Sequence, residues 1–169
     1  MSIISVRGKP KIVGIMGSHR DNSPSVNDAR LLGEAIAQKG HILLTGGGPG
    51  VMKAASEGAH DAGGLVIGIL PTERKRPLPC YPNEFVDIPI YTGMYDARNI
   101  INAKTPHVII ALGGGTGTLS EMAIAVKSGT PVIALNAPTM ECDDDRLFTS
   151  ASSVKDVLQK MDKILSGVP

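Results

Sequence analysis

Residues 107–121 read HVIIALGGGTGTLSE, and this stretch decides the fold. Its first six residues form an almost uninterrupted apolar run, and three glycines follow directly. From Thr118 a helix-like pattern continues to Lys127 and stops before Gly129. An apolar run without polar alternation is typical of a parallel strand covered by helices on both faces. The stretch therefore predicts a strand, a glycine turn and a helix in direct succession.

The same unit recurs on both sides of this stretch. Apolar runs predict further strands at residues 11–16, 41–45, 65–70 and 131–135, the last of these being the final strand; apolar periodicity predicts helices at residues 25–39, 51–62, 94–104, 118–127 and 154–165. Residues 85–91 contain Pro89, which favours a short or edge strand. Alternating strands and helices predict one doubly wound, Rossmann-like α/β domain over residues 1–169, with a mainly parallel sheet flanked by helices.

Composition excludes several classes of protein. The chain has 169 residues and a formal net charge of +1, whereas nucleic-acid binding needs a basic domain or stripe. No apolar run approaches the roughly 20 residues of a membrane span. The first 11 residues are too short and too polar for a secretion signal. We therefore expect a cytoplasmic protein with neither a nucleic-acid nor a membrane partner.

The residues that commonly bind metals are scattered. Cys80 and Cys142 have neither metal-ligand spacing nor the pattern of a disulfide framework, so reduced thiols are expected. The four histidines contain no H-x-x-x-H pair. The sequence therefore predicts no metal site.

Three loops are predicted to meet at the carboxyl edge of the sheet, where ligands bind in this fold. They are GSHRD at 17–21, GGGPG at 46–50 and GGGTGT at 113–118, and the last two each open a helix. Such a junction offers free N–H groups and the positive end of the helix dipole to an anion, most often a phosphate. The predicted binding residues are Gly17, Ser18, Gly46, Gly47, Gly48, Gly50, Gly113, Gly114, Gly115, Thr116, Gly117 and Thr118. His19 and Arg20 lie at the same edge, and for the 18–20 segment an ordinary polar loop is an equal alternative.

Glycine turns also have a purely structural explanation. Any such turn can use glycine for a tight bend, and Thr118 with Glu121 has the spacing of a capping box. Two glycine loops at one edge nevertheless favour ligand binding. The G-x-G-x-x-G dinucleotide fingerprint, the P-loop lysine and the G-x-S-x-G elbow do not occur, so an NAD dehydrogenase, an NTPase and a serine hydrolase are not predicted.

Two longer stretches carry a family resemblance. LLTGGGPGVMKAASEGA (43–59) and YDARNIINAKTPHVIIALGGGTGTLSEMAIAVKSGTPVI (95–133) resemble the Lonely Guy superfamily, whose members are often labelled lysine decarboxylase-like. The superfamily motif is P-G-G-x-G-T-x-x-E with an upstream arginine on a helix. Arg98 matches the arginine, and the motif is matched by Gly113, Gly114 or Gly115, Gly117, Thr118 and Glu121. Leu112 stands where the motif has proline, and the glycine run is longer by one residue.

Within the superfamily, the segments ILLTGG, DIPIYTG, ARNIINA and AIAVKSGTPVIAL are most similar to the molybdenum cofactor carrier branch. A second branch consists of cytokinin riboside monophosphate phosphoribohydrolases. Both branches imply a phosphate-bearing, nucleotide-like ligand and a homodimer or homotetramer; the carrier branch implies the molybdenum cofactor, a pterin with a terminal phosphate, and molybdoenzymes as acceptors. A decarboxylase is not supported, because no lysine environment suited to pyridoxal phosphate is recognisable.

Glu121 separates the two branches. Cleavage of an N-glycosidic bond passes through a cationic sugar, which a nearby carboxylate stabilises in the transition state. On this interpretation Glu121 is catalytic and Arg98 orients the ligand. The same Glu121 can instead hydrogen-bond a pterin without any chemistry, or cap its helix, and Arg98 can lie on a solvated helix flank. The carrier-like segments favour binding over hydrolysis. The basic loop at 73–82 is expected to be solvated.

Overall fold

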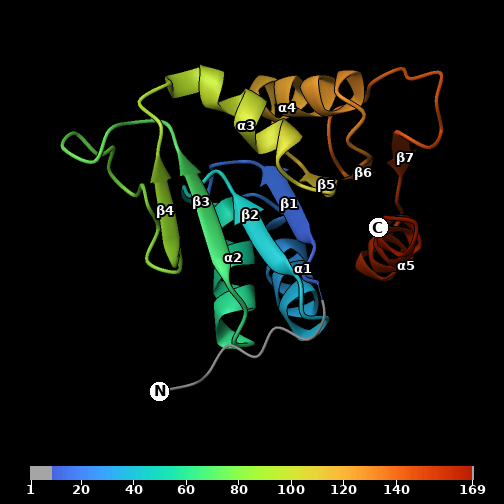
Figure 1. Ribbon diagram of the computed structural model, residues 1–169, viewed down its shortest axis with the longest axis horizontal. Helices are drawn as coiled ribbons and strands as arrows, with labels where there is room; N and C mark the ends of the chain where they lie inside the picture. Colours follow the sequence, from blue (N-terminus) through green and yellow to red (C-terminus); the bar gives the residue numbers. More distant parts are fainter. Residues whose placement is uncertain (1–8, 169) are drawn as a thin grey trace.

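A computed structural model describes residues 9–168, and its centre is a parallel sheet of seven strands in the order β4-β3-β2-β1-β5-β6-β7 (Figure 1). The strands are β1 Ile12–Gly17, β2 Ile42–Thr45, β3 Val66–Leu70, β4 Ile88–Tyr91, β5 Val108–Leu112, β6 Val132–Leu135 and β7 Phe148–Ser150. The helices are α1 Val26–Gln38, α2 Val51–Asp61, α3 Asn99–Lys104, α4 Thr116–Lys127 and α5 Val154–Ser166, with a short 3-10 helix η1 at Tyr95–Arg98. The predicted doubly wound α/β fold is confirmed.

Helices cover both faces of the sheet. One buried cluster joins α1, α2 and α5 to one face, with Leu32, Val51 and Met161 fully buried. The other joins α3 and α4 to the opposite face, where Ala103 and Met122 are fully buried. The central strand β5 is buried along its whole length. Burial on both faces explains why this strand shows no polar alternation.

The strand order reverses between β1 and β5. From β1 the chain adds β2, β3 and β4 on one side, and then returns to place β5 against the other side of β1. Such a reversal parts the connections on either side and leaves a crevice at the carboxyl ends of the strands. The edge position predicted for the Pro89 segment is also correct, because β4 ends the sheet (Figure 1).

The sequence predicted residues 131–135 as the final strand, and this prediction is wrong. β7 follows and pairs with β6 in parallel. It has three residues, all at least partly exposed. A strand this short and polar gives no apolar run for a sequence pattern to detect.

The helix predicted at 94–104 differs from the observed structure. It is a 3-10 turn, η1, followed by the six residues of α3. Met94 and Ala97 are exposed, whereas Asn102 and Ala103 are buried. A 3-10 turn has three residues per turn instead of 3.6. The α-helical spacing of apolar residues therefore does not predict which side chains are buried across the junction between η1 and α3.

α4 begins at Thr116, two residues before the predicted start. Its N-cap is Gly115 and has no side-chain cap hydrogen bond. Thr118 therefore lies inside the first turn, and Glu121 bonds to Asn102 instead of to its own helix end. The capping box considered as the structural explanation for Thr118 and Glu121 is not formed, because the N-cap lies three residues before Thr118.

Candidate functional site

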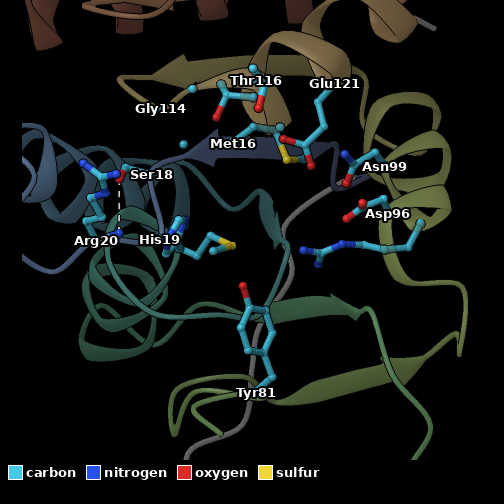
Figure 2. Close-up of a pocket in the computed structure, with 16 residues that line it drawn as sticks. Met16, Ser18, His19, Arg20, Tyr81, Asp96, Asn99, Gly114, Thr116 and Glu121 are labelled. Carbon is cyan, nitrogen blue, oxygen red and sulfur yellow. Dashed lines mark hydrogen bonds between the residues drawn. The ribbon is translucent and has the colours of Figure 1, made fainter. Parts of the chain in front are cut away.

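A cavity of about 560 Å³ lies at the strand-order reversal (Figure 2). Its walls are the ends of β1 and β5, the first turns of α2 and α4, the η1–α3 segment and one residue of the β3–β4 loop. The lining residues are Met16, Gly17, Ser18, His19, Arg20, Met52, Tyr81, Asp96, Arg98, Asn99, Gly114, Gly115, Thr116, Gly117, Thr118 and Glu121. Its size lies in the range of small-molecule sites, roughly 300 to 1,000 Å³.

The glycine loop after β5 forms one wall of this cavity. The backbone has positive φ at Gly113 (57°) and Gly114 (93°), which turns the chain sharply from the strand into α4. A side-chain carbon added at Gly115 or Gly117 would meet nothing within 4 Å. The first N–H groups of a helix have no partner within the helix, so the start of α4 presents donors to the cavity.

Glu121 lies one turn further along α4 and is 7% exposed. It accepts a hydrogen bond of 2.8 Å from Asn102 Nδ2. Burial raises the pKa of Glu121 to about 7, although the Asn102 hydrogen bond and the charge of Arg98 offset part of the increase. Near neutral pH this carboxyl group is therefore present in both forms, and it can either donate a hydrogen bond to a ligand or accept one.

Asn102 was not predicted as a site residue. It is fully buried, and its Oδ1 has no hydrogen-bond partner among residues 9–168. The sequence contained a weak signal for Asn102, which follows Asn99 by three residues within α3. That spacing places two polar side chains on one side of a helix.

Arg98 bridges the ends of two strands. Its Nη1 donates to the carbonyl oxygen of Gly46, after β2, at 2.6 Å, and also to that of Ile69 in β3. The guanidinium lies 5.9 Å from the centre of the Tyr81 ring. Arg98 therefore holds this wall of the cavity in place in addition to supplying positive charge near Glu121.

The first glycine loop, residues 46–50, has a different environment. A side-chain carbon would lie 2.7 Å from Arg98 Nη1 at Gly46, 2.3 Å from Leu70 Cδ2 at Gly47 and 2.3 Å from Tyr81 Cζ at Gly48. Gly50 donates its N–H to Asp21 Oδ1 at 2.9 Å. The structure does not bring Gly46, Gly47, Gly48 or Gly50 into the cavity lining, and Gly113 lines a neighbouring cavity instead.

Tyr81 is a second lining residue that the sequence analysis missed. Its hydroxyl points into the cavity from the side opposite Glu121 (Figure 2). Asn83 fixes the loop that carries it, because its N–H donates to Gly47 O at 2.8 Å and its Nδ2 to Gly48 O at 2.9 Å. Burial raises the pKa of Tyr81, so its hydroxyl is neutral near pH 7. In the same loop, residues 73–80 are exposed as predicted, whereas Tyr81 and Pro82, which end the segment predicted to be solvated, are half-buried.

Ser18, His19 and Arg20 follow β1 and line the cavity together with Gly17. The backbone N–H of Arg20 donates to Ser18 Oγ at 3.1 Å, which shapes this turn (Figure 2). The side chains of His19 and Arg20 make no ion pair within residues 9–168. Of the two alternatives open for this segment, the structure favours a position at the cavity.

Residues 9–168 contain no group of three histidine, cysteine, aspartate or glutamate side chains placed to hold a metal ion. In the same range, no helix has the length and apolar character needed to cross a membrane.

Comparison with known proteins gives one family match and two informative structural matches. A sequence model of the SLOG cluster4 family matches residues 10–164. The structure resembles the molybdenum cofactor binding protein of Rippkaea orientalis, with a TM-score of 0.81 and 38% identity, covering 93% of this chain and 98% of that one. It also resembles the Moco carrier protein of Chlamydomonas reinhardtii, with a TM-score of 0.82 and 34% identity, covering 95% of this chain and 100% of that one.

A curated relative belongs to the hydrolase branch. The cytokinin riboside 5'-monophosphate phosphoribohydrolase LOG of Oryza sativa subsp. japonica is 34% identical over 113 residues. The match covers 63% of this chain and 44% of the rice enzyme. The chain thus spans less than half of that enzyme, whereas it covers the two molybdenum cofactor proteins almost completely.

Proposed function

The chain belongs to the SLOG cluster4 family, and from this membership and the geometry of the cavity we propose that it binds the molybdenum cofactor as a carrier or storage protein. The observation that carries the proposal is the continuous cavity between the start of α4 and the buried Glu121. One end offers N–H and hydroxyl donors suited to a phosphate, and the other offers groups suited to a heterocycle.

The phosphate is assigned to the end formed by α4 and β1. The donors there are the first N–H groups of α4, the hydroxyl groups of Thr116 and Ser18, and the guanidinium of Arg20. A helix N-terminus and a guanidinium both favour a doubly charged anion. Thr118 contributes less, because its side chain is 4% exposed and packs over Gly114.

The heterocycle is assigned to the end near Glu121. A pterin ring carries hydrogen-bond donors and acceptors side by side on its edge. A carboxyl group with a pKa of about 7 and the amide of Asn99 can satisfy both kinds of atom. Tyr81 closes the opposite side with an aromatic ring and a neutral hydroxyl. The residues present therefore fit a phosphorylated pterin.

Hydrolysis of a nucleoside 5'-monophosphate is the alternative function. It is supported by the presence of a carboxylate in the cavity and by the similarity to the rice enzyme. A carboxyl group that is partly protonated at neutral pH stabilises a cationic sugar less than a fully ionised one does. The match to the carriers also extends over much more of both chains. Binding is therefore the preferred function.

The proposal includes a homodimer or homotetramer. Five large apolar side chains lie exposed on the edge strand β4 and on the adjoining η1–α3 segment: Ile88, Ile90, Met94, Tyr95 and Ile100. Exposed apolar side chains on adjoining segments favour an interface with a second copy of the chain. The same η1–α3 segment lines the cavity through Arg98 and Asn99, so an interface there would lie beside the ligand. Sedimentation of the wild-type protein as a monomer at micromolar concentration would contradict the proposed homodimer or homotetramer.

Two measurements test the proposed function. Mass spectrometry of natively purified protein should detect a bound pterin. Release of free base from adenosine monophosphate and from a cytokinin riboside monophosphate should be absent in wild type, in Glu121→Ala and in the exposed-carboxylate control Glu141→Ala. Glu121→Ala should weaken molybdopterin binding, whereas Glu141→Ala should not. Wild-type base release that Glu121→Ala abolishes would establish the hydrolase instead.

A further inference from the structure

A second cavity, of about 420 Å³, lies next to the first. It is formed by the loop between β1 and α1, the N-terminus of α1, the start of the second glycine loop and the residue that follows β6. Ser18, Arg20 and Gly114 line both cavities, so the two adjoin at these residues. Figure 2 shows these three residues together on one side of the first cavity.

The side chains specific to the second cavity are all neutral. They include Asn22, Ser23, Ser25 and Asn136. No carboxylate lines it: Asp21 is the nearest in sequence, and its Oδ1 instead accepts the N–H of Gly50 at 2.9 Å, at the start of α2. Arg20, which makes no ion pair within residues 9–168, supplies the positive charge. A cavity with hydroxyl and amide groups, one guanidinium and no acid suits an anion.

Ser25 provides an independent indication of a ligand. The residue is 2% exposed, its side chain makes no cap hydrogen bond, and it lines the second cavity. It occupies the N-cap position of the 13-residue helix α1. The hydroxyl faces Gly113, where an added side-chain carbon would lie 3.1 Å from Ser25 Oγ. Because Ser25 lines this cavity without bonding to its own helix, its hydroxyl is available to donate a hydrogen bond to an anion there.

We propose that the second cavity binds a second phosphate group, so that the protein takes organic diphosphates, such as nucleoside diphosphates, in preference to monophosphates. One phosphate group occupies the binding site at the start of α4, and the second phosphate group occupies the second cavity. The bridging oxygen lies beside Gly114. The inference rests on the proposed function, because it uses the phosphate-binding site assigned there.

Calorimetric titration with adenosine monophosphate and adenosine diphosphate tests this arrangement. Wild type should bind the diphosphate at least tenfold more tightly. Asn136→Asp places a carboxylate in the second cavity with little change of shape, and aspartate tolerates the positive φ of 52° at this position about as well as asparagine. This variant should lose the preference for the diphosphate, while its affinity for the monophosphate changes less than twofold.

Two further variants complete the test. Ser25→Ala removes a hydroxyl that makes no cap hydrogen bond, so it should fold normally and lose several-fold in affinity for the diphosphate alone. Gln159→Glu makes the same amide-to-acid change on the exposed face of α5 and should bind both nucleotides as wild type does. Equal wild-type affinities for the two nucleotides, no binding of either, or equal weakening of both by Asn136→Asp would overturn the second phosphate site. The proposed function is judged separately, by the pterin content of the native protein.

Discussion

The two glycine loops at the carboxyl edge of the sheet have almost the same sequence and very different surroundings. GGGPG at 46–50 is packed against side chains: Arg98, Leu70 and Tyr81 each lie within 3 Å of the side-chain carbon that one of its glycines would carry. GGGTG at 113–117 contains two glycines with nothing within 4 Å in that direction, and it opens onto the cavity. The first loop makes room for protein atoms at each of these glycines, whereas the second does so only at Gly113 and Gly114 and leaves room for a ligand at Gly115 and Gly117.

This difference shows that a glycine-rich loop can serve a site without touching the ligand. Gly46 leaves space for the guanidinium of Arg98 and Gly48 leaves space for the ring of Tyr81, and both of these side chains line the cavity. The first loop therefore acts through the residues packed on it. Four substitutions test this distinction, in order of decreasing expected effect.

Gly47→Ala should have the largest effect. Its backbone has a φ of 75°, and the new methyl group would lie 2.3 Å from Leu70 Cδ2, a side chain with no exposed surface. Strain and overpacking together should lower the free energy of unfolding by about 3 kcal/mol in urea denaturation. Gly40→Ala is the matched control, since its φ is 77° with nothing within 4 Å, and should cost only about 1 kcal/mol. Equal losses would mean that the first loop is not tightly packed.

Glu121→Gln tests the carboxylate behind the second loop. The pKa of Glu121 is about 7 in the folded protein against an ordinary value of 4.5, so the folded state holds the proton more tightly. Its contribution to stability is thus fully present below about pH 4.5 and is lost as pH rises to about 7. At pH 8 the variant should be more stable than wild type by on the order of 3 kcal/mol, and this advantage should vanish by pH 4.5. Parallel stability curves from pH 4 to 8 would contradict the raised pKa.

Gly46→Ala should act on ligand affinity through Arg98. The added methyl group would lie 2.7 Å from Arg98 Nη1 and would displace the end of a long side chain, which costs the fold little. The affinity for molybdopterin should fall about tenfold, or about 1.4 kcal/mol. In an Arg98→Ala background the same change should have little further effect, because both substitutions remove one interaction. Additive losses in this double-mutant cycle would show that Gly46 acts independently of Arg98.

Gly117→Ala should have the smallest effect on the fold, and of opposite sign. Gly117 lies in the first turn of α4 with open space beside it, so alanine should stabilise the helix by about 0.5 kcal/mol in thermal denaturation. The methyl group would occupy part of the cavity, and phosphate affinity should fall a few-fold. A loss of stability would show that the loop at 113–117 is packed against protein atoms at Gly117, as the loop at 46–50 is.

The sequence by itself determined the fold and the family. Continuous apolar runs separated by helical periods predicted the parallel sheet, and the resemblance to the Lonely Guy superfamily and its molybdenum cofactor carrier branch is confirmed by the family and structural matches. These features are local, because a strand buried on both faces must be apolar throughout, whatever else surrounds it. β7 was not predicted because its three residues are partly exposed and form no apolar run.

Only the tertiary structure distinguished the two glycine loops. The sequence does not show whether a side chain or a cavity lies beside a glycine. The residues that fill the space beside the first loop are distant in the chain: Arg98 lies beside Gly46, and Tyr81 lies beside Gly48. The raised pKa of Glu121 and the burial of Ser25 likewise depend on residues from other elements. Burial and close approach are properties of the packed fold, so no pattern along the chain could have supplied them.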